Sequence, residues 1–151
     1  MRRAGDGRSR WSCRRIISPW RAAIQGGGVD KERAAAWLDR YIDAWTTYDR
    51  EAIADLFAAD AEYRYHPYDD PVVGRDAVLH SWFEDRDEPN TYEARYEPVA
   101  VDGDVVVATG TSSYLDATGA VDRIYHNCFV MRFDGSGRCS EFTEWFMKRP
   151  G

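Results

Sequence analysis

The stretch Val121–Lys148 has the sequence VDRIYHNCFVMRFDGSGRCSEFTEWFMK. Apolar and polar residues alternate on both sides of Asp134–Gly137, a segment with two glycines, as is typical of two antiparallel strands joined by a tight turn. We therefore predict strands over Val121–Phe133 and Arg138–Lys148. Their pairing determines which of their side chains share a face of the sheet.

A two-residue loop at Gly135 and Ser136 would place Asn127 directly opposite Glu144. Aromatic residues would surround these two side chains on the same face of the sheet. The other predicted pairs are Phe129–Phe142 and Tyr125–Phe146 on this face, and His126–Trp145 and Cys128–Thr143 on the opposite face.

A carboxylate and an amide among aromatic residues form the kind of apolar surface with few polar groups that lines ligand pockets. Burial would raise the pKa of Glu144 and make it a candidate general acid or base, whereas a hydrogen bond from Asn127 would lower that pKa. Alternatively, the two side chains satisfy each other as a buried polar pair and take no part in chemistry.

Upstream of Val121, helical periodicity gives way to strand periodicity. Asp30 and Asp49 are the expected N-caps of the first two helices, the second of which should end near Asp60. The remaining expected elements are a strand over Ala61–His66, a loop with two prolines, a helix from Arg75 to about Asp85, and strands over Tyr92–Val101 and Asp104–Leu115.

Hairpin-connected strands after clustered helices predict an α+β fold. We expect a cone-like, curved antiparallel or mixed sheet whose open side is closed by three N-terminal helices around a small-molecule pocket. Residues 1–28 are expected to form a disordered, arginine- and glycine-rich tail, and residues 29–151 the single domain.

Charge is unevenly divided between these two parts. Residues 1–28 hold seven arginines and one acid, whereas the remainder holds 13 basic and 25 acidic residues. An acidic domain of this kind is not expected to bind nucleic acid, which usually requires a basic face. No apolar run is long enough to cross a bilayer, so we expect no membrane association.

Cysteine and histidine spacing argues against a metal or a disulfide framework. Three cysteines without a signal peptide favour reduced thiols and a cytoplasmic location. His66, His80 and His126 do not form a metal-binding spacing. We therefore predict neither a metal nor another cofactor.

Four sequence segments support a family resemblance: RYIDAWTTYD, LFAADAEYRY, VVGRDAV and RFDGSGRCSEFTEWF. From about Asp30 to Pro150 the chain resembles the nuclear transport factor 2-like superfamily, in its SnoaL-like branch. The resemblance implies a cone-shaped fold with a deep pocket and frequent dimerisation through the outer sheet face. Members include ketosteroid isomerases, polyketide cyclases, epoxide hydrolases, dehydratases and proteins without enzymatic activity.

Compared residue by residue, this chain matches some catalytic residues of the known enzymes and lacks others. Tyr41 matches the tyrosine that donates to the substrate oxygen in ketosteroid isomerases, but Tyr65 and Phe129 stand where those enzymes have their two aspartates. Glu144 matches an aspartate of the epoxide hydrolases, but the strand VVVATGTSSYL lacks their Arg-x-Asp pair.

Three hypotheses remain open. The first is an isomerase, cyclase, dehydratase or hydrolase acting on an apolar or amphipathic small molecule, with Glu144, Asn127 and Tyr41 as catalytic residues. The second is a ligand-binding domain without chemistry, and the third is a domain that mainly forms a homodimer through the outer sheet face around His126, Thr143 and Trp145. The expected ligand-contacting residues are Trp45, Tyr63, Tyr65, Trp82, Tyr125, Phe129, Phe142 and Phe146.

Overall fold

The computed structural model describes residues 28–151, so nearly all of the predicted tail lies outside the described residues. Helices and strands follow one another in an α+β order, as predicted. In chain order they are α1 (Lys31–Thr47), α2 (Arg50–Leu56), β1 (Phe57–Arg64), β2 (Val72–Val73), α3 (Arg75–Glu84), β3 (Tyr92–Asp102), β4 (Val105–Leu115), β5 (Val121–Phe133) and β6 (Cys139–Lys148).

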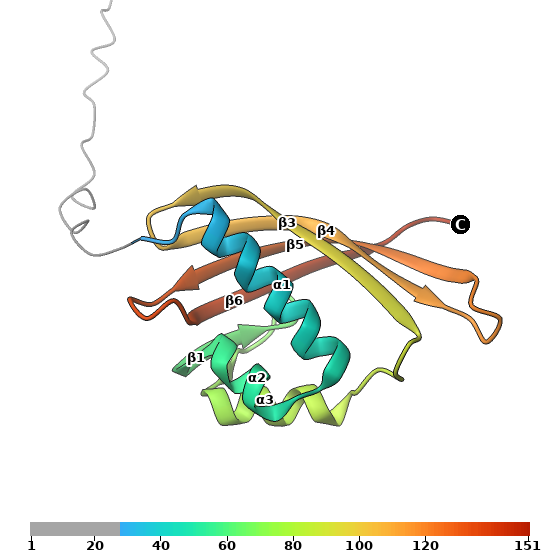
Figure 1. Cartoon of the computed structure of the whole chain (residues 1–151), viewed down its shortest axis with the longest axis horizontal. Coiled ribbons are helices and arrows are strands. Elements are labelled where there is room, and N and C mark those ends of the chain that lie inside the picture. The colour runs from blue at the N-terminus through green and yellow to red at the C-terminus, as the bar shows by residue number, and fades with distance from the viewer. Residues whose placement is uncertain (1–27) are drawn as a thin grey trace, which may run out of the picture.

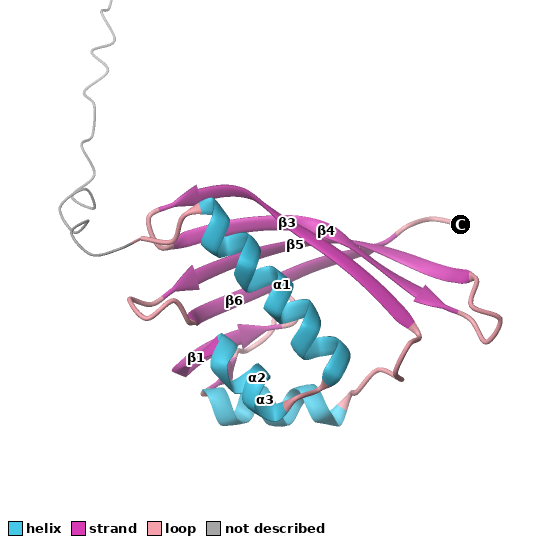
Figure 2. Cartoon of the chain, in the orientation of Figure 1, coloured by secondary structure: helices cyan, strands magenta, loops and turns pink. Residues whose placement is uncertain are grey.

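The strands form one mixed sheet in the order β2-β1-β6-β5-β4-β3. Neighbouring strands are antiparallel except β1 and β6, which are parallel. Helix α1 lies across one face of the long curved strands, while α2 and α3 lie near β1 (Figures 1 and 2). Within residues 28–151 there is no helix of the length and apolarity that crossing a membrane requires.

The first two helices begin at the predicted caps. The Asp30 and Asp49 carboxylates accept hydrogen bonds of 2.8 and 2.9 Å from backbone N–H groups of the first turns of α1 and α2. Tyr48 ends α1 in the left-handed conformation, with φ 51°, which reverses the chain before α2. The Trp37 indole N–H then joins the two helices by donating to the Leu56 carbonyl at 3.1 Å.

The predicted end of the second helix is wrong by several residues. Helix α2 ends at Leu56, and Phe57 is the first residue of β1, where it pairs with Cys139 of β6. Phe57 is 1% exposed, so burial of its side chain and pairing with β6 override the local helical pattern. Strand β2 is a further difference, because its two residues lie in the predicted loop and pair with β1.

The predicted register of β5 and β6 is also wrong, by two residues. Asp134 and Arg138 close a three-residue loop in which Gly137 has φ 82°, and the register shifts once more before Arg132 pairs with Glu141. Each of these two irregularities adds one residue to the β6 side, so the pairing shifts by two residues in total. Because side chains alternate between faces along a strand, a shift of two leaves every side chain on its predicted face. The observed pairs are Asn127–Phe146, Phe129–Glu144, Tyr125–Lys148, Met131–Phe142, His126–Met147, Cys128–Trp145 and Val130–Thr143.

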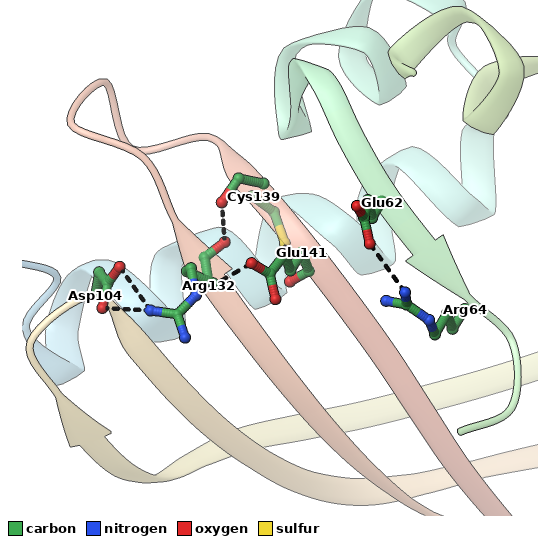
Figure 3. A network of polar contacts seen from close by, with 7 residues as sticks. Glu62, Arg64, Asp104, Arg132, Cys139 and Glu141 are labelled. Atoms are coloured by element: carbon green, nitrogen blue, oxygen red, sulfur yellow. Dashed lines mark hydrogen bonds and ion pairs between the residues drawn. The ribbon is translucent and has the colours of Figure 1, made fainter. Parts of the chain in front are cut away.

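An exposed ion-pair network stabilises this register on the outer face of the sheet (Figure 3). The Arg132 guanidinium contacts the Asp104 carboxylate at 2.9 Å and the Glu141 carboxylate at 3.3 Å. Arg132 thereby joins the β3–β4 turn to β5 and β6. Exposed pairs contribute little individually, and they contribute more where several charges form a network, as here.

Candidate functional site

A cavity of about 290 Å³ lies between the helices and the inner face of the sheet. Aromatic side chains make up most of its wall, with a few polar groups among them, as in small-molecule sites. The lining residues are Tyr41, Trp45, Tyr48, Tyr63, Tyr65, Trp82, Tyr96, Tyr114, Tyr125 and Phe146, together with Ser81, Asp85, Asp87, Ser112, Arg123, Asn127 and Glu144.

Glu144 and Asn127 meet in this wall. The Asn127 amide N–H donates to Glu144 Oε1 at 2.8 Å, and the Ser112 hydroxyl donates to Asn127 Oδ1 at 3.3 Å. The contact is diagonal across β5 and β6, because Glu144 lies opposite Phe129. Asn127 and Ser112 are 6% and 4% exposed, so this short chain of hydrogen bonds fixes the amide and holds the carboxylate in place.

Burial raises the pKa of Glu144 to about 7, although the Asn127 hydrogen bond and the His66 charge act in the opposite direction. Among residues 28–151, no arginine or lysine forms an ion pair with Glu144. A carboxyl group with this pKa is present in both protonation states near neutral pH. It can therefore either accept or donate a proton.

Two buried tyrosines supply hydroxyl groups to the same cavity. The Tyr41 and Tyr63 hydroxyl oxygens are 3.1 Å apart, and either can be the donor. Burial raises the pKa of both phenols well above 10, so both remain neutral. Since the pair contains two protons and uses one internally, the other is available to a ligand.

A second polar group forms where the connection after α3 meets α1. The Trp45 indole N–H donates to Asp87 Oδ2 at 3.1 Å, and the Asp87 backbone N–H donates to the Tyr48 hydroxyl at 2.9 Å. Tyr92 donates to the Trp45 carbonyl at 2.8 Å and stacks on the indole. These contacts fix a half-buried carboxylate in the cavity wall.

Gly110 of β4 lacks a side chain where the Tyr96 ring of the cavity wall lies against the strand. It lies opposite Tyr96 in the β3–β4 pair, and a Cβ atom at this position would approach the Tyr96 ring to 2.6 Å and also meet the Arg95 carbonyl oxygen. A glycine is therefore required for the β3 backbone at Arg95 to approach β4 this closely and for the Tyr96 ring to pack over it. The ring then contacts Phe129, with centroids 4.6 Å apart.

Most of the site residues predicted from the sequence lie around this one cavity. The two exceptions are Phe129 and Phe142, which are 1% and 0% exposed and pack together in the core. Phe129 and Phe142 therefore pack behind the lining residues and do not line the cavity themselves. The predicted residues in the wall are Tyr41, Trp45, Tyr63, Tyr65, Trp82, Tyr125, Asn127, Glu144 and Phe146, and their roles toward a ligand stay predictions.

Sequence reasoning did not identify eight of the lining residues. Tyr96, Ser112 and Tyr114 occupy inward positions of predicted strands, so strand alternation could have identified them. Asp85 and Asp87 lie at and just beyond the end of α3, where no periodic pattern indicates the direction of a side chain. The others are Tyr48, Ser81 and Arg123.

Comparison with known proteins supports the fold. The SnoaL-like domain family matches residues 38–142. The crystal structure of a "putative ketosteroid isomerase" from Kribbella flavida aligns with a TM-score of 0.59 and 19% identity, covering 81% of this chain and 83% of that one. A nuclear transport factor 2-like protein of unknown function from Burkholderia xenovorans aligns with a TM-score of 0.59 and 20% identity, covering 80% of this chain and 89% of that one.

A search of curated proteins found no match. The solved structures share the fold at identities too low to transfer a reaction. The family match, in contrast, spans more than half of the chain: it begins within α1 and includes α2, α3 and most of the sheet. This chain therefore belongs to the SnoaL-like domain family of the nuclear transport factor 2-like superfamily.

Proposed function

We propose that this chain binds an apolar or amphipathic small molecule in the aromatic cavity and transfers a proton on it, with Glu144 as the acid or base. The observation that carries this proposal is a carboxyl group in a cavity wall, held by one amide hydrogen bond, with its pKa raised to about 7 by burial. A general acid or base works best when its pKa lies near the working pH.

In the proposed reaction, ionised Glu144 accepts a proton from a carbon next to a ligand carbonyl. The free hydroxyl proton of the Tyr41–Tyr63 pair stabilises the negative charge that develops on the carbonyl oxygen. Protonated Glu144 then returns the proton to another position, as an isomerase, cyclase or dehydratase requires. Asn127 keeps the carboxylate oriented through both steps.

This assignment differs from that of the ketosteroid isomerases, whose general base corresponds to Tyr65 of this chain. Burial raises the pKa of Tyr65, and its hydroxyl lies 2.8 Å from the Ser81 hydroxyl. A neutral, hydrogen-bonded phenol is a poor base at neutral pH. We therefore assign proton transfer to Glu144, the carboxyl group of the wall whose pKa burial raises to about 7.

Cavity size limits the ligand. A volume of about 290 Å³ lies at the lower end of ligand pockets, which span roughly 300–1,000 Å³. Flat aromatic walls favour a compact molecule with an apolar body. Small cyclic or aromatic carbonyl compounds fit these requirements.

The proposal can be tested without knowing the natural substrate. Small ketones such as phenylacetone and indanone are incubated with the protein in heavy water, and NMR follows exchange of the protons next to the carbonyl. The wild type is expected to accelerate exchange, and Glu144→Gln to slow it by about a hundredfold. Glu141→Gln is the matched control, because Glu141 lies on the same strand and is exposed on the outer face. Equal exchange rates with wild type and Glu144→Gln would refute the proposal.

The second candidate is a domain that binds the same ligands without chemistry. The diagonal Asn127–Glu144 hydrogen bond supports it, because a satisfied polar pair needs no catalytic role. This candidate predicts ligand binding by the wild type and by Glu144→Gln, with no acceleration of exchange by either. Calorimetric titration alongside the exchange assay separates the two functions.

A homodimer is compatible with either candidate. Trp145 and Met147 are 39% and 68% exposed on the outer face of β6, beside Cys128 and His126 of β5. Large apolar side chains on an open sheet face are typical of an interface. Sedimentation velocity is expected to give a dimer that Trp145→Glu converts to a monomer.

A further inference from the structure

We propose that the ligand of this cavity is an organic amine, positively charged at neutral pH, whose ammonium group lies beside Asp87 while its uncharged end reaches Glu144. This inference specifies the ligand class of the proposed function and depends on it for the role of Glu144. It follows from the charges and the aromatic faces of the cavity wall.

The charged side chains of the wall are mostly acidic. They comprise the carboxylates of Asp85, Asp87 and Glu144 and one guanidinium, that of Arg123. Burial raises the pKa of Asp87 despite the nearby Arg123 charge, so its ionised form lacks full compensation. A cationic ligand would supply the missing charge, whereas an anionic one would add to the repulsion.

Arg123 has limited capacity to attract an anion instead. Its Nη1 atom lies 3.1 Å from the Asp122 carboxylate, and its guanidinium carbon lies 4.2 Å from the centre of the Tyr114 ring. Both contacts use the positive charge that an anionic ligand would need. Arg123 therefore offsets acidic charge around the cavity without making it a site for anions.

Aromatic rings lie around Asp87, and two of them contact guanidinium groups of the chain itself. Arg86 lies 4.5 Å above the Tyr48 ring, in the same manner as Arg123 above Tyr114. The Trp45 indole adds a third π system, and its N–H orients the Asp87 carboxylate. A carboxylate among electron-rich rings is the combination that recognises alkylammonium groups.

Tyr96 and Ser112 add neutral polar groups to the same wall. The Tyr96 side chain is 7% exposed and lines the cavity, and its hydroxyl lies beside that of Ser112. The charge of the whole chain, −6, would also attract a cationic ligand over longer distances.

The test compares three probes of similar size that differ in charge: phenethylamine, phenethyl alcohol and hydrocinnamate. Each is titrated into the full chain by calorimetry or ligand-observed NMR. Phenethylamine is expected to bind about tenfold more tightly than phenethyl alcohol, and hydrocinnamate to bind most weakly. Equal or tighter binding of the alcohol or of hydrocinnamate would overturn the inference, as would the absence of binding by all three at millimolar concentration.

Variants locate the ammonium group. Asp87→Asn is expected to weaken phenethylamine binding about tenfold and leave phenethyl alcohol unchanged, and Asp85→Asn is expected to cause a smaller loss in the same direction. Glu93→Gln, at an exposed position of β3, is the control that should change neither probe. Circular dichroism verifies that each variant is folded, and an unchanged amine preference in both folded aspartate variants would contradict the inference.

The outcome is separable from that of the proposed function. Glu144→Gln leaves Asp87 intact, so it should retain the preference for the amine while losing proton exchange. If proton exchange is absent in the wild type but the amine preference persists, the catalytic proposal fails and the ligand class stands. If exchange is present but the amine binds no more tightly than the other probes, the catalytic proposal stands and the proposed ligand class fails.

Discussion

Glu144→Gln should increase the stability of the protein at alkaline pH and leave it unchanged at acidic pH. The folded state holds the Glu144 carboxyl in its protonated form up to a pKa of about 7, compared with an ordinary value of 4.5. Between these values the unfolded chain releases its proton while the folded chain retains it. Stability therefore falls as pH rises through this window and is constant above it.

The magnitude follows from the same two values. A difference between about 7 and 4.5 corresponds to about 3 kcal/mol at full ionisation, at 1.36 kcal/mol for each pH unit. Glutamine has nearly the same shape, cannot ionise, and keeps an oxygen that accepts from Asn127. The variant should thus be more stable than wild type by about 3 kcal/mol near pH 8, with no difference near pH 4.

Urea unfolding at the two pH values measures this difference. Glu141→Gln is the control: its carboxylate is exposed and pairs with Arg132 at 3.3 Å, so its loss should cost less than about 1 kcal/mol with no comparable change between the two pH values. A Glu144→Gln variant that is equally or less stable than wild type near pH 8 would refute the reasoning. The carboxylate would then be well solvated, despite its place in the cavity wall.

Three further outcomes follow from single contacts. Asp49→Ala should destabilise the protein by about 1 kcal/mol in urea unfolding, because it removes the 2.9 Å cap of α2. Gly110→Ala should cost about 2 kcal/mol or more by the same measurement, because the added methyl group meets the backbone carbonyl of Arg95, and it should change the near-ultraviolet circular dichroism, because the same methyl group displaces the Tyr96 ring. Tyr41→Phe should lower ketone exchange about tenfold in the deuterium assay, with the ketone still bound in calorimetry, because it removes one of the two hydroxyl groups.

Regular elements of the fold could be predicted from the sequence because each carries a strong local signal. Asp30 and Asp49 are caps with direct hydrogen bonds, and β5 has the predicted bounds Val121–Phe133. Errors arose where distant partners decide the structure. Phe57 belongs to a helical pattern locally, but its pairing with Cys139 places it in a strand.

The candidate site could be predicted only in part, for a similar reason. The faces of β5 and β6 were correct although the register was not, because the loop ending at Gly137 and the irregularity before Arg132 together shift the pairing by an even number of residues. Asn127 and Glu144 consequently still meet, diagonally instead of directly opposite each other. Asp87 could not be predicted, since its position depends on tertiary hydrogen bonds to Trp45 and Tyr48.

A direct titration of the Glu144 carboxyl group tests the central claim, that burial in the aromatic cavity keeps this acid partly protonated near neutral pH. Carbon-13 NMR of the side-chain carboxyl carbons, with Glu144→Gln used to assign the resonance, gives the midpoint without any knowledge of the ligand. We predict a midpoint of about 7. A midpoint near the ordinary value of 4.5 would show that the carboxylate is ionised throughout the neutral range, and would contradict its proposed role in proton transfer.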